Sequence, residues 1–172
     1  QNKPDRPYKD AGYDELARDY EAVTEQIHRF AGPELSSTFT TVHWAEATWD
    51  GVRALKDRGV KGLIGLFDQR RGQTPFTRYY LSEEIADHVA ARDYWWDPDM
   101  DMLYVSCDSV VNTYALDDVV PRLEKVASSP HTSEVIELLI HEQYFREELD
   151  IYQPDVQEKV LRAVEWVSDR GY

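Results

Sequence analysis

The feature that most constrains the fold is a pair of nearly continuous apolar runs, residues 60–67 (VKGLIGLF) and residues 102–108 (MLYVSCD). Runs of this length without polar alternation are typical of strands that are buried on both faces, as in a parallel sheet covered by helices. Segments with apolar residues at every third or fourth position flank both runs and indicate amphipathic helices. This alternation predicts an α/β protein in which right-handed crossovers join mainly parallel strands.

Residue periodicity places the remaining elements along the chain. Helices are expected over residues 13–30, 48–58, 82–91, 116–127 and 154–170. Further strands are expected over residues 37–44 and 135–141, with a short edge strand over residues 77–81 and an aromatic-rich loop over residues 93–101. Within the second helix, the spacing predicts that Trp49, Val52 and Leu55 face inward.

The number of strands limits the architecture. Four main strands are too few to close a barrel of about eight. The pattern therefore predicts a single α/β domain over residues 1–172, with either an open, mainly parallel sheet or half of a barrel.

Composition excludes several partners. A formal net charge of -14 and a pI of about 4.7 disfavour nucleic acid and anionic membranes, because an acidic surface repels phosphate. The single cysteine, Cys107, excludes a disulfide within the chain and a cysteine-based zinc site. No apolar run reaches the ~20 residues that span a bilayer.

Because the sequence starts Gln-Asn-Lys-Pro, without Met, we expect the chain to be a piece of a longer protein.

Polar residues follow the predicted strands, and ligands of parallel α/β folds bind at the carboxyl ends of strands. These strand-end residues are predicted to share one rim: His43, Trp44, Glu46, Asp108, Asn112, His141, Glu142 and Tyr144. Structural alternatives stay open, because a strand-end histidine can bond a carbonyl and Asp108 can cap a turn. Glu46 can be a helix N-terminal acid, and Glu142 a plain surface residue.

The Trp95-Trp96 pair also has two interpretations. Aromatic rings beside acids can stack on the faces of sugar rings, or they can simply cover a core. The standard nucleotide, serine-hydrolase, metalloprotease and calcium motifs are absent (GxGxxG, the P-loop, GxSxG, HExxH and the EF-hand loop), which removes those chemistries from consideration.

Several phrases resemble one family: PDRPYKDAGYDEL, TTVHWAEATWDGVRALKDRGVKGLIGLF and IELLIHEQYF. They are similar to bacterial proteins of the polysaccharide deacetylase-like family. The resemblance implies a distorted (β/α) barrel that uses a divalent metal to hydrolyse N- or O-acetyl groups on carbohydrates. Matched by position, His141 would be the general acid, and Asp108 would lie at the family's histidine-orienting aspartate motif. The HWAEAT phrase stands where the family has an Arg-x-Pro-aromatic motif.

The resemblance also bears on cofactors and partners. The family's early metal-binding aspartate and His-x-x-x-His pair are absent from this chain, so no metal is expected in the chain itself. A divalent metal, zinc by preference, is expected only together with upstream sequence. Because half a barrel leaves strand edges and apolar faces uncovered, we expect self-association or pairing with the missing half.

Three functional hypotheses follow. The first is a part of a carbohydrate-active, metal-dependent hydrolase, inactive as an isolated chain, with His141 and Asp108 as catalytic residues and the other rim residues binding the carbohydrate substrate. The second is a non-catalytic carbohydrate-binding or structural α/β module. The third uses two of Glu46, Asp108 and Glu142 as glycosidase carboxylates, which requires a separation of about 5–10 Å.

Overall fold

The computed structural model describes residues 8–67 and 78–172. The chain divides into two compact units, the first formed by Gln1–Ala90 with Tyr94–Ser106 and the second by Ala91–Asp93 with Cys107–Tyr172. The described residues hold five α-helices and a small, mostly parallel sheet, which confirms the mixed α/β class. None of the helices in these ranges combines the length and the apolar character needed to cross a membrane.

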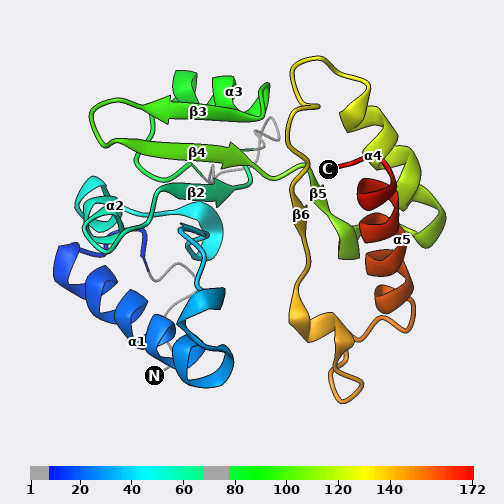
Figure 1. Cartoon of the computed structure of the whole chain (residues 1–172), viewed down its shortest axis with the longest axis horizontal. Coiled ribbons are helices and arrows are strands. Elements are labelled where there is room, and N and C mark those ends of the chain that lie inside the picture. The colour runs from blue at the N-terminus through cyan, green and yellow to red at the C-terminus, as the bar shows by residue number, and fades with distance from the viewer. Residues whose placement is uncertain (1–7, 68–77) are drawn as a thin grey trace. The chain divides into compact units, whose positions relative to one another are not determined.

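A four-stranded sheet organises the first unit (Figure 1). Its strands follow the order β1 (Phe39–Thr40), β2 (Gly62–Gly65), β4 (Met102–Ser106) and β3 (Tyr94–Asp97). The β1–β2 and β2–β4 pairs are parallel, and the β3–β4 pair is antiparallel. The helices of this unit are α1 (Tyr13–Ala31), α2 (Trp49–Lys56) and α3 (Glu83–Ala90). The predicted parallel order therefore holds for three strands, and an antiparallel edge strand completes the sheet.

The core of the first unit forms around one row across this sheet. The register places Leu63 of β2 beside Tyr104 of β4, and Tyr104 beside Trp95 of β3. Leu63 and Tyr104 are fully buried. The Tyr104 ring lies 5.6 Å from the Tyr79 ring and 6.0 Å from the Trp95 ring, in tilted geometries that aromatic quadrupoles favour.

The expectation of a loop over residues 93–101 was wrong, because Tyr94–Asp97 forms strand β3. The Asp97 side chain accepts hydrogen bonds from the backbone N–H groups of Asp99 and Met100, at 3.0 and 3.3 Å. This Asx-type turn reverses the chain without the Asn-Gly pair that usually indicates a hairpin.

Two predicted strands of the first unit differ from the structure. The strand expected over residues 37–44 is only Phe39–Thr40, and His43–Ala45 forms a 3-10 turn. The edge strand expected over residues 77–81 is wrong in its described part: residues 78–81 form a turn in which Tyr79 has a φ of 54°. Thr77 lies outside the described residues.

Helix α2 follows the sequence pattern with one exception. Val52 and Leu55 are buried as predicted, but Trp49 is 44% exposed. The centroid of the Trp49 ring lies 5.2 Å from the Arg53 guanidinium, a cation–π contact on the helix surface. Thr48 caps the helix, because its Oγ1 accepts the N–H of Gly51 at 3.0 Å.

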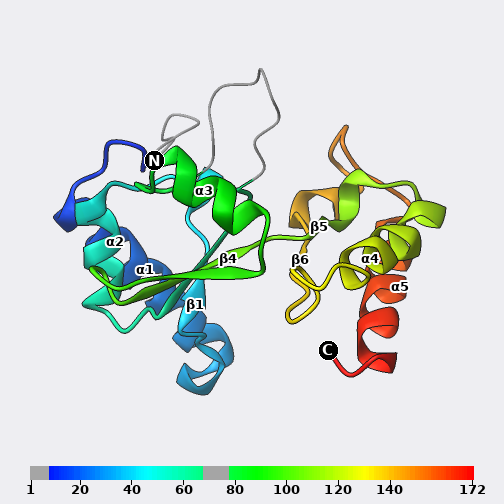
Figure 2. The ribbon, with the colours of Figure 1, turned by 90° about the horizontal axis from the view of Figure 1, so that it is seen from above.

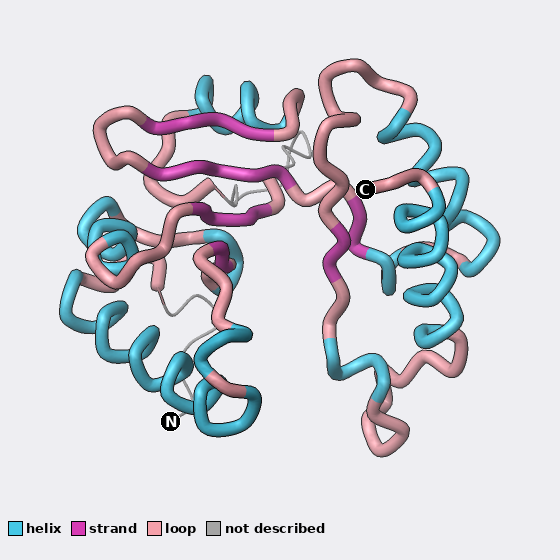
Figure 3. The backbone as a smooth tube through the Cα atoms, viewed as in Figure 1, coloured by secondary structure: helices cyan, strands magenta, loops and turns pink. Residues whose placement is uncertain are grey.

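The second unit packs α4 (Val119–Ala127) against α5 (Val156–Asp169), as Figure 2 shows. Its core contains Val111, Val119, Leu123, Ala163 and Trp166. A separate two-stranded parallel sheet pairs β5 (Ser109–Val110) with β6 (Leu138–Leu139), seen in Figure 3.

The strand expected over residues 135–141 is therefore only Leu138–Leu139, and both residues are half-buried. The backbone N–H groups that a longer strand would donate to a neighbouring strand donate to side chains instead. Asp93 accepts the N–H groups of Glu134 and Val135, and Asp108 accepts the N–H of Glu137. Because these donors bond carboxylates, they are not available to a neighbouring strand.

Candidate functional site

The candidate residues of the first unit lie in the turn that follows β1. His43 and Trp44 are both exposed, and their ring centroids are 5.9 Å apart. Trp44 has φ 64° and ψ 11°, and Ala45 has a φ of 48°. Two consecutive non-glycine residues in the left-handed region cost about 1–3 kcal/mol each, and such strain is concentrated at functional sites.

Tyr79 holds this turn in its strained form. Its backbone N–H donates to the Ala45 carbonyl at 2.6 Å, and its hydroxyl donates to the Ile64 carbonyl at 2.6 Å. The Val42 N–H in turn donates to the Tyr79 hydroxyl at 3.4 Å. Burial raises the pKa of Tyr79 to about 12, so the hydroxyl keeps its proton at neutral pH.

Gly65 is the residue that makes room for the turn. A Cβ at this position would lie 2.9 Å from the Ala45 Cβ and 3.2 Å from the Tyr79 ring. The turn therefore depends on a close approach that only glycine allows.

Glu46 follows the turn and is 7% exposed. It is not the N-terminal acid of α2, because Thr48 is the N-cap and Asp50 is the acid of the first turn. The structure therefore removes one of the alternatives for Glu46, and leaves a buried carboxyl beside the His43–Ala45 turn.

His141 and Asn112 form the main polar contact of the second unit. Asn112 is 3% exposed, and its Oδ1 lies 3.0 Å from His141 Nδ1. The same oxygen accepts the backbone N–H of His141 at 3.3 Å. A backbone N–H requires an acceptor, so the second contact identifies the Asn112 atom as the carbonyl oxygen.

This arrangement determines the tautomer of His141. Since Asn112 Oδ1 can only accept, His141 Nδ1 carries the hydrogen, and in the neutral ring Nε2 holds the lone pair. The Tyr144 ring packs edge-on against the imidazole at 6.1 Å between centroids. An oriented, half-buried imidazole of this kind can serve as a general acid or base.

Asp108 lies close to this segment but contacts its backbone. Its Oδ2 accepts the Glu137 N–H at 2.9 Å, and its carbonyl accepts Arg122 Nη2 at 3.0 Å. Burial raises the pKa of the Asp108 carboxyl from 3.8 to about 6, and the neighbouring Asp93 and Glu137 carboxyls also raise it. The Glu137 N–H and the Arg122 guanidinium act in the opposite direction.

Asp93 is the polar residue that sequence reasoning missed. It is 6% exposed, and its Oδ2 accepts the N–H groups of Glu134 and Val135 at 2.8 and 3.3 Å. Its Oδ1 is buried without a hydrogen-bond partner in the described part of the chain. The available signal was an acid directly before the Tyr-Trp-Trp run, in a stretch that was expected to be an aromatic-rich loop.

The predicted rim residues thus form two groups. His43, Trp44 and Glu46 belong to the first unit, whereas Asp108, Asn112, His141, Glu142 and Tyr144 belong to the second. Within the second group, the structure brings Asn112, His141 and Tyr144 into contact, while Glu142 is exposed at the start of a 3-10 turn. No group of three His, Cys, Asp or Glu side chains in residues 8–67 and 78–172 is arranged to hold a metal ion.

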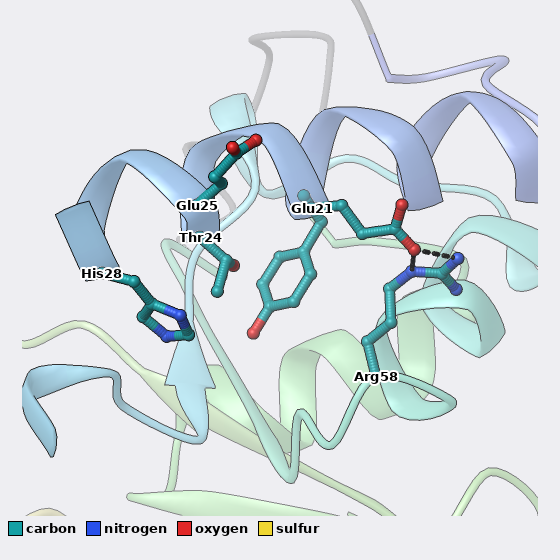
Figure 4. Close-up of a pocket in the computed structure, with 6 residues that line it drawn as sticks. Glu21, Thr24, Glu25, His28 and Arg58 are labelled. Atoms are coloured by element: carbon teal, nitrogen blue, oxygen red, sulfur yellow. Dashed lines mark hydrogen bonds and ion pairs between the residues drawn. The ribbon is translucent and has the colours of Figure 1, made fainter. Parts of the chain in front are cut away.

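A shallow groove of about 380 Å³ runs along α1 in the first unit (Figure 4). Its lining comprises Tyr20, Glu21, Thr24, Glu25, His28 and Arg58. Arg58 donates to Glu21 Oε1 from Nε at 2.8 Å and from Nη2 at 2.6 Å. The two charges compensate each other, and we assign no function to the groove.

The fold and these contacts define an α/β protein with a strained strand-end turn in one unit and an oriented histidine in the other. No family model, curated protein or solved structure matches the chain. Its function is therefore inferred from the contacts of its own residues, together with the sequence resemblance given above.

The raised pKa of Asp108 predicts a pH dependence of stability. Between pH 4 and pH 6 the unfolded carboxyl ionises while the folded one still holds its proton, so unfolding becomes more favourable as the pH rises. Asp108→Asn cannot ionise and still accepts the Glu137 N–H. We expect this variant to gain stability relative to the parent from pH 4 to pH 7, measured by urea unfolding. Glu124→Gln, at an exposed acid of the same unit, is the control, and an equal change in both variants would contradict the assignment.

The strain at Trp44 predicts a substitution that stabilises the fold. Asn tolerates the left-handed region better than Trp, so Trp44→Asn should leave the free energy of unfolding unchanged or raise it by up to about 1 kcal/mol. Trp49→Asn, at an exposed tryptophan in the first position of α2, should lower it by a few tenths, because the cation–π contact with Arg53 is lost. A loss well above 1 kcal/mol in Trp44→Asn would show that the indole stabilises the turn.

Proposed function

We propose that this chain is part of a carbohydrate-active hydrolase that removes N- or O-acetyl groups, and that His141 is its general acid. The observation that carries the proposal is the double contact of Asn112 Oδ1 with the ring and backbone of His141. The resemblance to polysaccharide deacetylases points to the same residue. Under this proposal, β1, β2 and β4 belong to a partial (β/α) barrel of that type, and β3 is an added edge strand.

The proposed chemistry is a proton transfer at His141 Nε2. Water attacks the acetyl carbonyl, the bond from that carbon to the sugar nitrogen or oxygen breaks, and acetic acid and the free amine or alcohol are released. One proton of the attacking water stays on the acetic acid, and the other returns through solvent to the imidazole after it has protonated the leaving group. The protonated imidazole gives its Nε2 proton to the departing nitrogen or oxygen. Asn112 is a positioning residue, because it keeps the hydrogen on Nδ1 and fixes the ring plane.

A divalent metal would activate the attacking water in an enzyme of this class. The described residues do not offer a set of ligands for such an ion. No step of the proposed proton transfer is therefore assigned to a metal held by these residues.

His141→Ala tests the proposal in the protein that carries this chain. We expect kcat for acetate release from acetylated chito- or xylo-oligosaccharides to fall by about 10²–10⁴. Asn112→Ala should lower kcat less and shift its pH profile, because the imidazole loses its fixed tautomer. His88→Ala, at an exposed histidine of α3, is the control. Unchanged acetate release in His141→Ala would contradict the role of His141, and no release by the parent protein would contradict the hydrolase.

A second candidate, carbohydrate binding without catalysis, is favoured by the side chains of β3. Successive strand residues face opposite sides, so Tyr94 and Trp96 share one face and Trp95 occupies the other. Tyr94 is 45% and Trp96 50% exposed, while Trp95 packs on Tyr104. The exposed pair forms an aromatic surface that suits the apolar face of a sugar ring.

Calorimetry with chito- and xylo-oligosaccharides tests this candidate. Trp96→Ala should weaken binding about tenfold, since aromatic stacking contributes about 1–1.5 kcal/mol. Trp49→Ala, which removes an exposed tryptophan from α2, should leave affinity unchanged. Absence of binding heat with every oligosaccharide, or equal effects of the two variants, would contradict binding on β3.

A further inference from the structure

Three carboxyl groups of the second unit meet at one segment of the chain, residues 134–137. Asp93 Oδ2 accepts two backbone N–H groups of this segment, at 2.8 and 3.3 Å. Asp108 Oδ2 accepts the N–H of Glu137 at 2.9 Å, and Glu137 itself carries the third carboxyl. These three side chains are called the carboxyl cluster below. The segment that they hold leads into β6 and then to His141.

The carboxyl cluster has no ion-pair partner in the described part of the chain. None of the ion pairs among the described residues involves one of its three acids. The charge of Arg122 acts on Asp108, but its Nη2 donates to the Asp108 main-chain carbonyl at 3.0 Å and its Nε is buried without a partner. Arg92, which precedes Asp93 in the chain, contacts the ring of His131. The like charges of the cluster are therefore not neutralised by a contacting cation.

Burial makes this uncompensated charge costly. Asp93 is 6% exposed and its Oδ1 has no hydrogen-bond partner among the described residues, while Asp108 and Glu137 are half-buried. Burial raises the pKa of Asp108 to about 6 and also raises the pKa of Glu137. The neighbouring Cys107 thiol keeps its proton, because burial raises its pKa to about 12. Asp108 is thus the group that exchanges a proton with solvent near pH 6.

We propose that Asp93, Asp108 and Glu137 act as a proton-dependent latch on residues 134–137. With a proton on Asp108, the carboxyl cluster holds the segment and the chain that follows it to His141. When Asp108 loses this proton, the added negative charge repels the two neighbouring carboxyl groups, and the segment opens. The latch closes in acid and opens toward neutral pH.

The direction follows from two opposing effects on Asp108. The ionised carboxylate is the better acceptor for the Glu137 N–H, which favours the closed segment. Burial and the neighbouring carboxyls favour the protonated form, and they outweigh the hydrogen bond because the pKa is raised overall. In the open segment the carboxyl returns to its ordinary pKa of 3.8. Between pH 4 and pH 6 the open form therefore binds fewer protons, and opening becomes more favourable as the pH rises.

Amide hydrogen exchange of the 172-residue chain, followed by NMR at about pH 4.5 and pH 6.5 and corrected for intrinsic exchange rates, tests the latch. We expect the protection of the Glu134, Val135 and Glu137 amides to fall roughly tenfold over this range. These amides should exchange faster than that of the fully buried Ala163 in α5, because the segment opens locally. Since exchange is measured on the segment itself, the result is independent of the role proposed for His141.

Three variants separate Asp108 from other titrating groups. Asp108→Asn cannot ionise and still accepts the Glu137 N–H, so the protection of the segment should become nearly independent of pH. Glu124→Gln removes an exposed acid of α4, and His131→Gln removes the imidazole three residues before the segment. Both controls should keep the roughly tenfold response of the parent.

Four results would overturn the latch. The first is protection of residues 134–137 that does not change with pH in the parent chain. The second is a response that Asp108→Asn retains, and the third is a response that His131→Gln or Glu124→Gln abolishes. The fourth is equal protection of the segment and of Ala163 at both pH values, which would show that the segment opens only when the whole unit unfolds.

Discussion

The side chains of the buried Asp93 and the half-buried Asp108 hold the segment on which the second unit depends. Residues 134–137 lead into β6 and His141, yet their N–H groups bond Asp93 and Asp108 in place of a neighbouring strand. Backbone N–H groups of a folded chain need acceptors, and here the two acids take the place of a sheet partner. The side chain of Asn112 continues the same pattern by accepting the His141 N–H. The orientation of the candidate acid thus follows from how this segment satisfies its backbone.

In the first unit, a cluster of aromatic side chains holds the candidate turn in place. Tyr104 at the centre of the sheet contacts Trp95 and Tyr79, and Tyr79 extends the cluster to the turn after β1. The hydrogen bonds of Tyr79 stabilise the left-handed conformation of Trp44 and Ala45. The conformation of the strained turn therefore depends on a core side chain, Tyr79, that lies far from the turn in the sequence.

Much of the candidate site could be predicted from the sequence, because polar residues that follow apolar strands can be recognised without a structure. Asn112, His141 and Tyr144 were among those residues, and the structure brings them into contact. Asp93 could not be identified in this way, because its burial depends on a segment 41 residues further along the chain. The β3 strand was missed because an Asp97 side chain, and not an Asn-Gly pair, turns the chain.

Local sequence patterns identify the α/β class, the five helices of the described part and the two buried strands, since periodicity and continuous apolar runs are local properties. Contacts between distant residues set the lengths of β1 and β6, the side of Trp95-Trp96 that meets the core and the side chain that orients His141. Those outcomes depend on which partner satisfies each backbone donor and which ring fills each space. The acceptors and rings that do so come from distant parts of the chain, so local sequence patterns do not predict them.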